Sequence, residues 1–313
     1  MGEKLTIGTR GSALARWQAN HVADRLRALP GGPEVALELI QTEGDRILDV
    51  ALSRLPGKAF FTKELEQAIL DGRVDLAVHS LKDVETEMPP GLTLGAVLER
   101  EDPRDVLIAR DGLRLATLPE GARIGTSSLR RTAFLLRWRQ DLEIRDLRGN
   151  VPTRIEKLDR GEYDAIVLAA AGVKRLGEAD RITDYFPDDI LVPAVSQGAI
   201  AIQHREDDER VGALVGALDH AATRAATAAE RALLRRVEGG CQVPVGAHAT
   251  IADGAVRLRA VVCSLDGSEA VEGETAGPLA EAAALGRELA DDLLERGGRA
   301  ILDGIRTSSS SGA

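Results

Sequence analysis

The feature that most constrains this chain is a strand–turn–helix pattern that occurs twice. "LTIGTRGSALARWQ" matches "ARIGTSSLRRTAFLLRWRQ", since each has a strand, Ile-Gly-Thr, a serine that can cap a helix, and the helix itself. "LDGRVDLAVHSLKDV" and "LDRGEYDAIVLAAAGVKRL" form a second matching pair in the same order, each with an aspartate three residues after a glycine. Short apolar strands that alternate with helices indicate parallel sheets covered on both faces. The sequence therefore predicts two similarly built α/β domains.

The last third of the chain has a different pattern. After a helix predicted over about 223–238, "VGAHATIADGAVRLRAVVCSLDGSEAVEGE" alternates with a period of two, which is typical of an antiparallel meander. A final helix near 279–296 would cover this sheet. The predicted domains are 1–99 with 195–218 (α/β), 100–194 (α/β) and 219–305 (a smaller α+β domain), followed by a disordered tail at 306–313.

Composition narrows the class of partner. A net charge of −10 and only eight aromatic residues (two Trp, two Tyr, four Phe) argue against nucleic acid. No apolar run approaches the roughly 18 residues that a membrane span needs. We therefore expect no membrane partner. Two cysteines build no disulfide framework, which favours a reducing cytoplasm as the location of the protein.

Both Ile-Gly-Thr turns lead into helix N-termini, which suit anions because their backbone N–H groups and positive dipole ends are free. The serines could also do no more than cap their helices. Several hydroxyl and cationic side chains near these turns and near strand ends favour an anion site, and arginine in particular suits carboxylates. The residues concerned are Arg10, Ser12, Thr126, Ser127, Ser128, Arg130, Arg131, Arg148, Arg154, Lys174 and Arg175.

The stretch "AVHSLKDVE" places Lys82 and Asp83 where a buried strand emerges. The two charges could form a surface ion pair, but at the end of a strand Asp83 could instead bind a substrate N–H and stabilise developing positive charge. We expect His79 to point into the fold as a satisfied histidine. The five histidines show no ligand spacing and neither cysteine has a thiol nearby, so no metal site is predicted.

Cys241 lies in "EGGCQVPVGA", directly after the helix predicted to end near residue 238. The helix C-terminus and the adjacent Glu238 would raise the pKa of its thiol, which makes it a poor activated nucleophile. One of several open alternatives is a thiol that carries a permanently attached group. Cys263, in an alternating strand, is most simply a buried small hydrophobe.

Taken together, these motifs resemble the porphobilinogen deaminase (hydroxymethylbilane synthase) family of tetrapyrrole and heme biosynthesis. The most specific stretches are "HSLKDV", "GTSSLRRT" and "EGGCQVP", and the likeness runs in the family's order up to about residue 300. The resemblance implies two domains of the type II periplasmic-binding-protein kind with a hinged cleft, plus a smaller α+β domain. It implies a monomeric transferase that joins four porphobilinogen units head to tail on a covalent dipyrromethane primer. Ammonia is released at each step, and hydroxymethylbilane is then freed by hydrolysis.

The same resemblance assigns roles to residues. Asp83, with Lys82, would be catalytic, and Cys241 would hold the dipyrromethane cofactor through a thioether. Lys58 and Phe61 would belong to a flap, and Ser196 stands where the family usually has glycine. The residues implied to bind the cofactor are Cys241, Lys82, Asp83, Ser128, Arg130, Arg131 and Arg154. Those implied to bind the substrate are Arg10, Ser12, Thr126, Ser127, Arg148, Arg154 and Arg175.

Two other functions fit part of the sequence. A non-catalytic two-lobed protein that binds a carboxylate or oxyanion would explain the arginine turns but not Asp83 or Cys241. A transferase with a cysteine nucleophile would need a base paired with Cys241, and the sequence offers none nearby.

Overall fold

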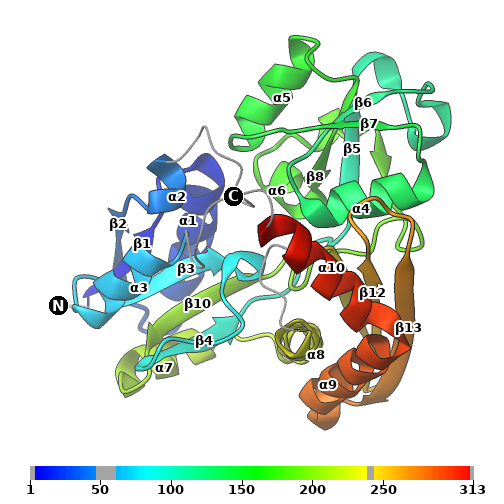
Figure 1. Ribbon diagram of the computed structural model, residues 1–313. Helices are drawn as coiled ribbons and strands as arrows, with labels where there is room; N and C mark the ends of the chain where they lie inside the picture. Colours follow the sequence, from blue (N-terminus) through cyan, green and yellow to red (C-terminus); the bar gives the residue numbers. More distant parts are fainter. Residues whose placement is uncertain (1–3, 47–60, 238–242, 311–313) are drawn as a thin grey trace. The chain divides into compact units, whose positions relative to one another are not determined.

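The computed structural model describes residues 4–46, 61–237 and 243–310 (Figure 1). These residues group into two compact units. Unit 1 comprises residues 1–101 and 198–224, and unit 2 comprises residues 102–197 and 225–313.

Unit 1 contains a five-stranded sheet in the order β2-β1-β3-β10-β4. The first three strands of the chain run parallel, while β10 is antiparallel to both of its neighbours, β3 and β4. Helices α1 and α7 pack on one apolar face of the sheet and α3 packs on the other. The elements are β1 (Lys4–Thr9), α1 (Ala13–Arg27), β2 (Glu34–Leu39), α2 (Glu43–Arg46), α3 (Lys63–Leu70), β3 (Leu76–Ser80), the 3-10 turn η2 (Leu81–Asp83), β4 (Leu92–Val97), β10 (Ile200–Arg205) and α7 (Glu209–Gly216).

The first sheet of unit 2 has the same plan, in the order β7-β6-β8-β5-β9. Again the parallel strands come as second, first and third, and an antiparallel strand, here β5, separates them from the edge strand. The elements are β5 (Asp105–Ala109), η3 (Arg110–Gly112), η4 (Leu115–Thr117), β6 (Arg123–Gly125), α4 (Leu129–Trp138), β7 (Glu143–Arg145), α5 (Val151–Asp159), β8 (Ala165–Ala169), α6 (Ala170–Arg175), η5 (Ala179–Arg181) and β9 (Asp184–Tyr185). The prediction of two similarly built α/β domains is confirmed.

The aspartate of the repeated motif has the same structural task in both sheets. Asp75 Oδ2 accepts a hydrogen bond from the backbone N–H of Thr6 at 2.7 Å, and Asp164 Oδ2 accepts one from that of Arg123 at 2.9 Å. Each carboxylate thereby satisfies a donor where the first parallel strand of its sheet begins. The preceding glycine at each helix end has a positive φ, +68° at Gly72 and +77° in the second copy, which favours glycine.

The C-terminal part of unit 2 is the predicted antiparallel meander. Helices α8, α9 and α10 and the β11–β12 ribbon share one apolar core. Asp253 and Gly254, both with positive φ, form the turn between β11 and β12 that "ADG" predicts. The elements are α8 (Ala221–Arg236), β11 (Val245–Ala252), β12 (Ala255–Cys263), β13 (Ala270–Pro278), η6 (Leu279–Glu281), α9 (Ala282–Leu293), η7 (Leu294–Gly298) and α10 (Arg299–Ser310). The fold class, two α/β sheet domains and a smaller α+β part, is confirmed.

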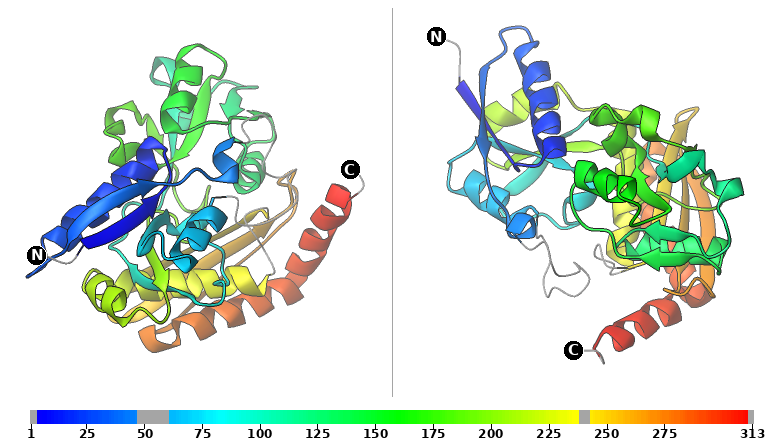
Figure 2. Two further views of the ribbon diagram at one scale, coloured as in Figure 1. Left: turned by 90° about the vertical axis from the view of Figure 1, so that its left-hand side faces the viewer. Right: turned by 90° about the horizontal axis from the view of Figure 1, so that it is seen from above.

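The tail predicted at 306–313 differs from the structure over residues 306–310. Helices α9 and α10 follow one another with a bend at η7, and α10 continues to Ser310 (Figure 2). Ile301, Leu302 and Ile305 are buried against the meander, so they hold α10 in place. The serine-rich composition concealed this helical spacing. The predicted domain boundaries and the hinge remain predictions.

Ser196 is a fully buried residue with a φ of +63°, in the left-handed region that favours glycine. Its backbone N–H donates to Glu230 Oε2 at 2.6 Å, and Glu230 Oε1 accepts from the N–H of Ala249 at 2.7 Å. A carboxylate on α8 therefore holds this unfavourable conformation. The conformation also explains why the resemblance shows glycine at this position.

Candidate functional site

A pocket in unit 1 lies where β1 and β3 end. Its cavity volume is about 60 Å³. Four of the predicted site residues line it, namely Arg10, Ser12, Phe61 and Asp83. Four polar neighbours complete it, namely Gln18, Thr62, His79 and Ser80. The structure thus brings together the first Ile-Gly-Thr turn and the "HSLKD" turn, which the sequence analysis treated separately.

Arg10 leaves β1 at its C-terminal end and stacks on an aromatic ring. Its guanidinium carbon lies 4.1 Å from the centroid of the Phe61 ring, at cation–π distance. Two residues later, Ser12 caps α1, and its Oγ accepts a hydrogen bond from the N–H of Ala15 at 3.3 Å. The capping role predicted as an alternative for Ser12 is therefore real, and the same residue still lines the pocket.

Asp83 ends the 3-10 turn that follows β3. Ser80, at the end of β3, accepts a hydrogen bond from Gln18 Nε2 at 2.8 Å, which ties this strand end to α1. Lys82 is partly buried in the same turn as Asp83, but it is not among the described residues that line the pocket. The structure thus places a carboxylate and a guanidinium in one small pocket, while Lys82 lies beside it.

His79 faces inward, as predicted, and it also forms part of the pocket wall. Its Nε2 lies 3.0 Å from Gln203 Oε1. Burial, assisted by the charge of Arg10 and opposed by Gln203, lowers the pKa of His79 to about 4. The ring is therefore uncharged at neutral pH. Its place in the pocket wall could not be predicted from the sequence, because its partner Gln203 is 124 residues away along the chain.

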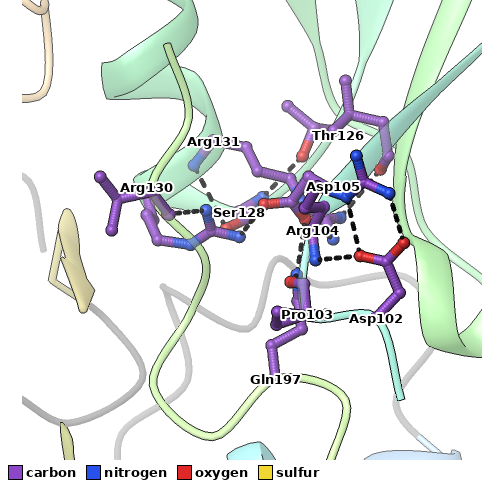
Figure 3. A network of polar contacts seen from close by, with 11 residues as sticks. Asp102, Pro103, Arg104, Asp105, Thr126, Ser128, Arg130, Arg131 and Gln197 are labelled. Carbon is purple, nitrogen blue, oxygen red and sulfur yellow. Dashed lines mark hydrogen bonds and ion pairs between the residues drawn. The ribbon is translucent and has the colours of Figure 1, made fainter. Parts of the chain in front are cut away.

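Helix α4, which follows the second Ile-Gly-Thr turn in unit 2, contributes two arginines to a buried network of charges (Figure 3). Asp105 lies between Arg130 Nη2 at 2.8 Å and Arg131 Nη2 at 2.7 Å, and it also accepts from Gln197 Nε2 at 3.1 Å. Burial alone would raise the pKa of Asp105, but these cations and Gln197 outweigh it and lower the pKa to about 2. Ser128 caps α4 by accepting from the Arg131 N–H at 3.4 Å.

The two arginines also bind backbone oxygens. Arg130 Nη1 donates to the carbonyl of Val192 at 2.6 Å, and Arg131 Nη1 donates to that of Val167 at 2.8 Å. Their side chains are only 6% and 7% exposed. Both guanidiniums therefore have structural partners within unit 2, and their binding of cofactor carboxylates stays a prediction.

The other predicted residues of unit 2 lie on several elements. Thr126 Oγ1 accepts from the Ser128 N–H at 3.2 Å, and Ser127 Oγ donates to the carbonyl of Leu147 at 3.0 Å. Arg148 precedes α5, and Arg154 on that helix donates from Nε to the Gly149 carbonyl at 2.7 Å. Arg175 ends α6, and its neighbour Lys174 pairs with Asp102 at 3.3 Å.

Some predictions lie outside the described residues, namely those for Cys241 and Lys58. Cys263, which lies within them, is fully buried on β12 as predicted, and burial raises the pKa of its thiol. Among the described residues, no group of three or more His, Cys, Asp or Glu side chains could hold a metal ion. Nor does any helix in the described ranges have the length and apolar character to cross a membrane.

Two family models match the chain. Residues 5–213 match "Porphobilinogen deaminase, dipyromethane cofactor binding domain", and residues 225–295 match "Porphobilinogen deaminase, C-terminal domain". The chain belongs to the porphobilinogen deaminase family. The predicted family, its transferase activity in tetrapyrrole and heme biosynthesis, and its dipyrromethane cofactor are confirmed, and the alternative of a non-catalytic binding protein is not supported.

Curated relatives extend the porphobilinogen deaminase match over nearly the whole chain. The chain is 52% identical over 309 residues to the porphobilinogen deaminase of Desulforudis audaxviator, covering 99% of this chain and 100% of that protein. It is 51% identical over 302 residues to that of Pelobacter propionicus, covering 96% and 97%. Among solved structures, the probable amino-acid ABC transporter extracellular-binding protein ytmK from Bacillus subtilis is 13% identical, with a TM-score of 0.39 over 68% of this chain and 88% of that one.

Proposed function

We propose that the pocket in unit 1 is where this chain performs the reaction of its family. That reaction joins four porphobilinogen units head to tail, releases ammonia at each step, and ends with hydrolysis that frees hydroxymethylbilane. The observation that carries the proposal is that Asp83 and Arg10 line the same pocket. Their opposite charges match the two kinds of group on the substrate, a pyrrole N–H and its acetate and propionate carboxylates.

Asp83 is proposed to act on the nitrogen side of the substrate. Its carboxylate accepts the hydrogen bond of a pyrrole N–H and stabilises the cationic azafulvene formed when ammonia leaves. A fixed carboxylate at this point also accepts the proton lost when the new carbon–carbon bond forms. Lys82, in the same turn, is proposed to assist by binding a carboxylate next to Asp83.

Cationic and hydroxyl side chains are proposed to bind the carboxylates. In unit 1, Arg10 is held by the Phe61 ring, with Ser12 nearby, so its guanidinium is already ordered for a bidentate contact. In unit 2, Ser128, Arg130, Arg131 and Arg154 are proposed for the cofactor. Thr126, Ser127, Arg148, Arg154 and Arg175 are proposed for the substrate and the growing chain.

The described residues fit an acidic dipyrrole cofactor, because carboxylate and guanidinium groups match its N–H and carboxylate groups. Cys241 is proposed to hold it through a thioether, and Lys58 is proposed, with Phe61, to belong to a flap. The bound dipyrromethane supplies the pyrrole carbon to which the first substrate unit is joined. The chain's own residues bind the carboxylates, orient the rings and hold the proton at Asp83.

The remaining proposals concern the setting of the reaction. We propose a monomeric, cytoplasmic enzyme whose partner is porphobilinogen. A net charge of −10 supports a protein that binds no nucleic acid, since a polyanionic partner would be repelled.

Asp83→Asn tests the proposal, because it keeps the size of the side chain and removes its charge. We expect kcat to fall by roughly a hundredfold to a thousandfold, the range seen when one stabilising group is removed from a transition state. Intact mass should still show the dipyrrole adduct. Glu87→Gln is the matched control, since Glu87 is an exposed carboxylate a few residues away. A near-normal rate in Asp83→Asn would remove Asp83 from its proposed role.

A further inference from the structure

A chain of buried polar side chains runs beneath the pocket of unit 1. It starts at His79 on β3, continues through Gln203 on β10, and ends at Glu66 on α3. His79 Nε2 lies 3.0 Å from Gln203 Oε1, and Gln203 Nε2 donates to Glu66 Oε1 at 3.4 Å. The three residues are 5%, 0% and 7% exposed. Polar groups from three different elements are thus buried together, and they orient the His79 ring in the pocket wall.

The direction of these hydrogen bonds fixes the tautomer of the ring. The Gln203 amide nitrogen is directed to Glu66 and to Met88 Sδ, at 3.7 Å, so its oxygen faces His79. An amide oxygen only accepts, so His79 Nε2 carries the proton and donates it. Nδ1 is then the acceptor nitrogen of an uncharged ring. Burial lowers the pKa of His79 and raises that of Glu66, so both groups tend toward their neutral forms.

We propose that His79 is a substrate-binding residue whose Nδ1 accepts a hydrogen bond from the ammonium of the substrate's aminomethyl group. Gln203 and Glu66 are positioning residues that hold the ring in the required tautomer. The inference rests on the proposed function of the same pocket. An uncharged acceptor suits this place, because a protonated imidazole beside Arg10 would repel both the ammonium group and the cation formed when ammonia leaves.

Two amide substitutions separate this role from a purely structural one. In His79→Gln the amide nitrogen can take the place of Nε2 and keep the bond to Gln203, but the acceptor at Nδ1 is lost. In His79→Asn the shorter amide places an acceptor near Nδ1 and loses the bond to Gln203. A substrate contact predicts that His79→Gln loses roughly tenfold to a hundredfold in kcat/KM, the value of one hydrogen bond to a charged group, and that His79→Asn recovers part of it. A purely structural role predicts the reverse order.

A pyrrole dicarboxylate that lacks the aminomethyl group provides the second measurement. Because it has no ammonium, its inhibition constant should be the same in wild type and His79→Gln. Weaker inhibition in His79→Gln, or an unchanged kcat/KM for porphobilinogen, would overturn the inference. Asp83→Asn is measured in parallel. If wild type consumes porphobilinogen and Asp83→Asn does not, the proposed function stands whatever the His79 variants show; a wild type without activity would defeat the proposed function itself.

Discussion

Asp105→Asn should destabilise the chain by about 3–5 kcal/mol, the cost of removing one partner from a buried ion pair. Asp105 is fully buried between Arg130 and Arg131, at 2.8 and 2.7 Å (Figure 3). Asparagine keeps the shape and one acceptor oxygen, so the loss reports the charge. Two guanidiniums would then remain buried together without a carboxylate. Because native proteins are stable by only about 5–15 kcal/mol, this loss is a large fraction of the total.

Urea unfolding measures this free energy, with the m-value checking that the same surface is exposed in both variants. The matched control is Asp24→Asn, whose partner Arg27 also lies at 2.8 Å, but whose side chain is 74% exposed. An exposed pair at the same distance should contribute less than about 1 kcal/mol. Equal, small losses in the two variants would refute the argument that burial makes the Asp105 network strong.

The same network predicts a pH dependence. The pKa of Asp105 is about 2 in the folded chain, against an ordinary value of 3.8. A depressed carboxyl pKa contributes stability above the unfolded pKa, and this stability is lost as the pH falls through the folded pKa. Roughly 2 kcal/mol should therefore disappear between about pH 4 and pH 2. Asp105→Asn should lack this part of the acid transition.

Three further predictions concern stability. Ser196→Gly should stabilise the chain by about 1 kcal/mol and raise Tm by a few degrees. The change removes the cost of a left-handed φ and a buried hydroxyl that has no hydrogen-bond partner in the described ranges, and the greater backbone entropy of glycine in the unfolded chain offsets part of this gain. An unchanged or lower Tm would contradict this. Because the pKa of His79 is lowered to about 4, unfolding free energy should fall by roughly 3 kcal/mol as the pH drops from about 6.5 to about 4, and His79→Gln should abolish that slope in urea titrations. Gly95→Ala should cost about 1–3 kcal/mol in the same assay, because its Cβ would lie 2.5 Å from the His204 ring and from Val215; a neutral effect would show that both side chains yield.

The architecture was predictable because it is encoded locally and twice. Strand ends, serine caps and glycine turns lie within a few residues of one another, so a single sequence reveals them. The paired aspartates, Asp75 and Asp164, each accept a hydrogen bond from a backbone N–H of the first parallel strand of their sheet. The repeated sequence motif therefore corresponds to a repeated structural contact. The C-terminal helix was missed because the composition around Ser310 outweighed the spacing of the three apolar residues before it.

The site was predictable only in part, because its contacts are long-range. Arg10 and Asp83 could be identified at strand ends, yet nothing local placed them in one pocket. In the Asp105 network, Arg131 is 26 positions and Gln197 is 92 positions from the carboxylate, so the sequence alone left the arginines available for a ligand. The carboxylate itself lies in "EREDPRD", directly after the predicted domain boundary between residues 99 and 100, where no site residue was predicted.

The most direct test is the intact mass of the purified chain and two serine variants. Wild type and Cys263→Ser should each weigh more than their sequences by one dipyrrole, because the Cys263 thiol is fully buried on β12. Cys241→Ser should have the mass of its sequence alone and should not turn over porphobilinogen. An active wild type of unmodified mass, or an adduct lost only in Cys263→Ser, would contradict the account.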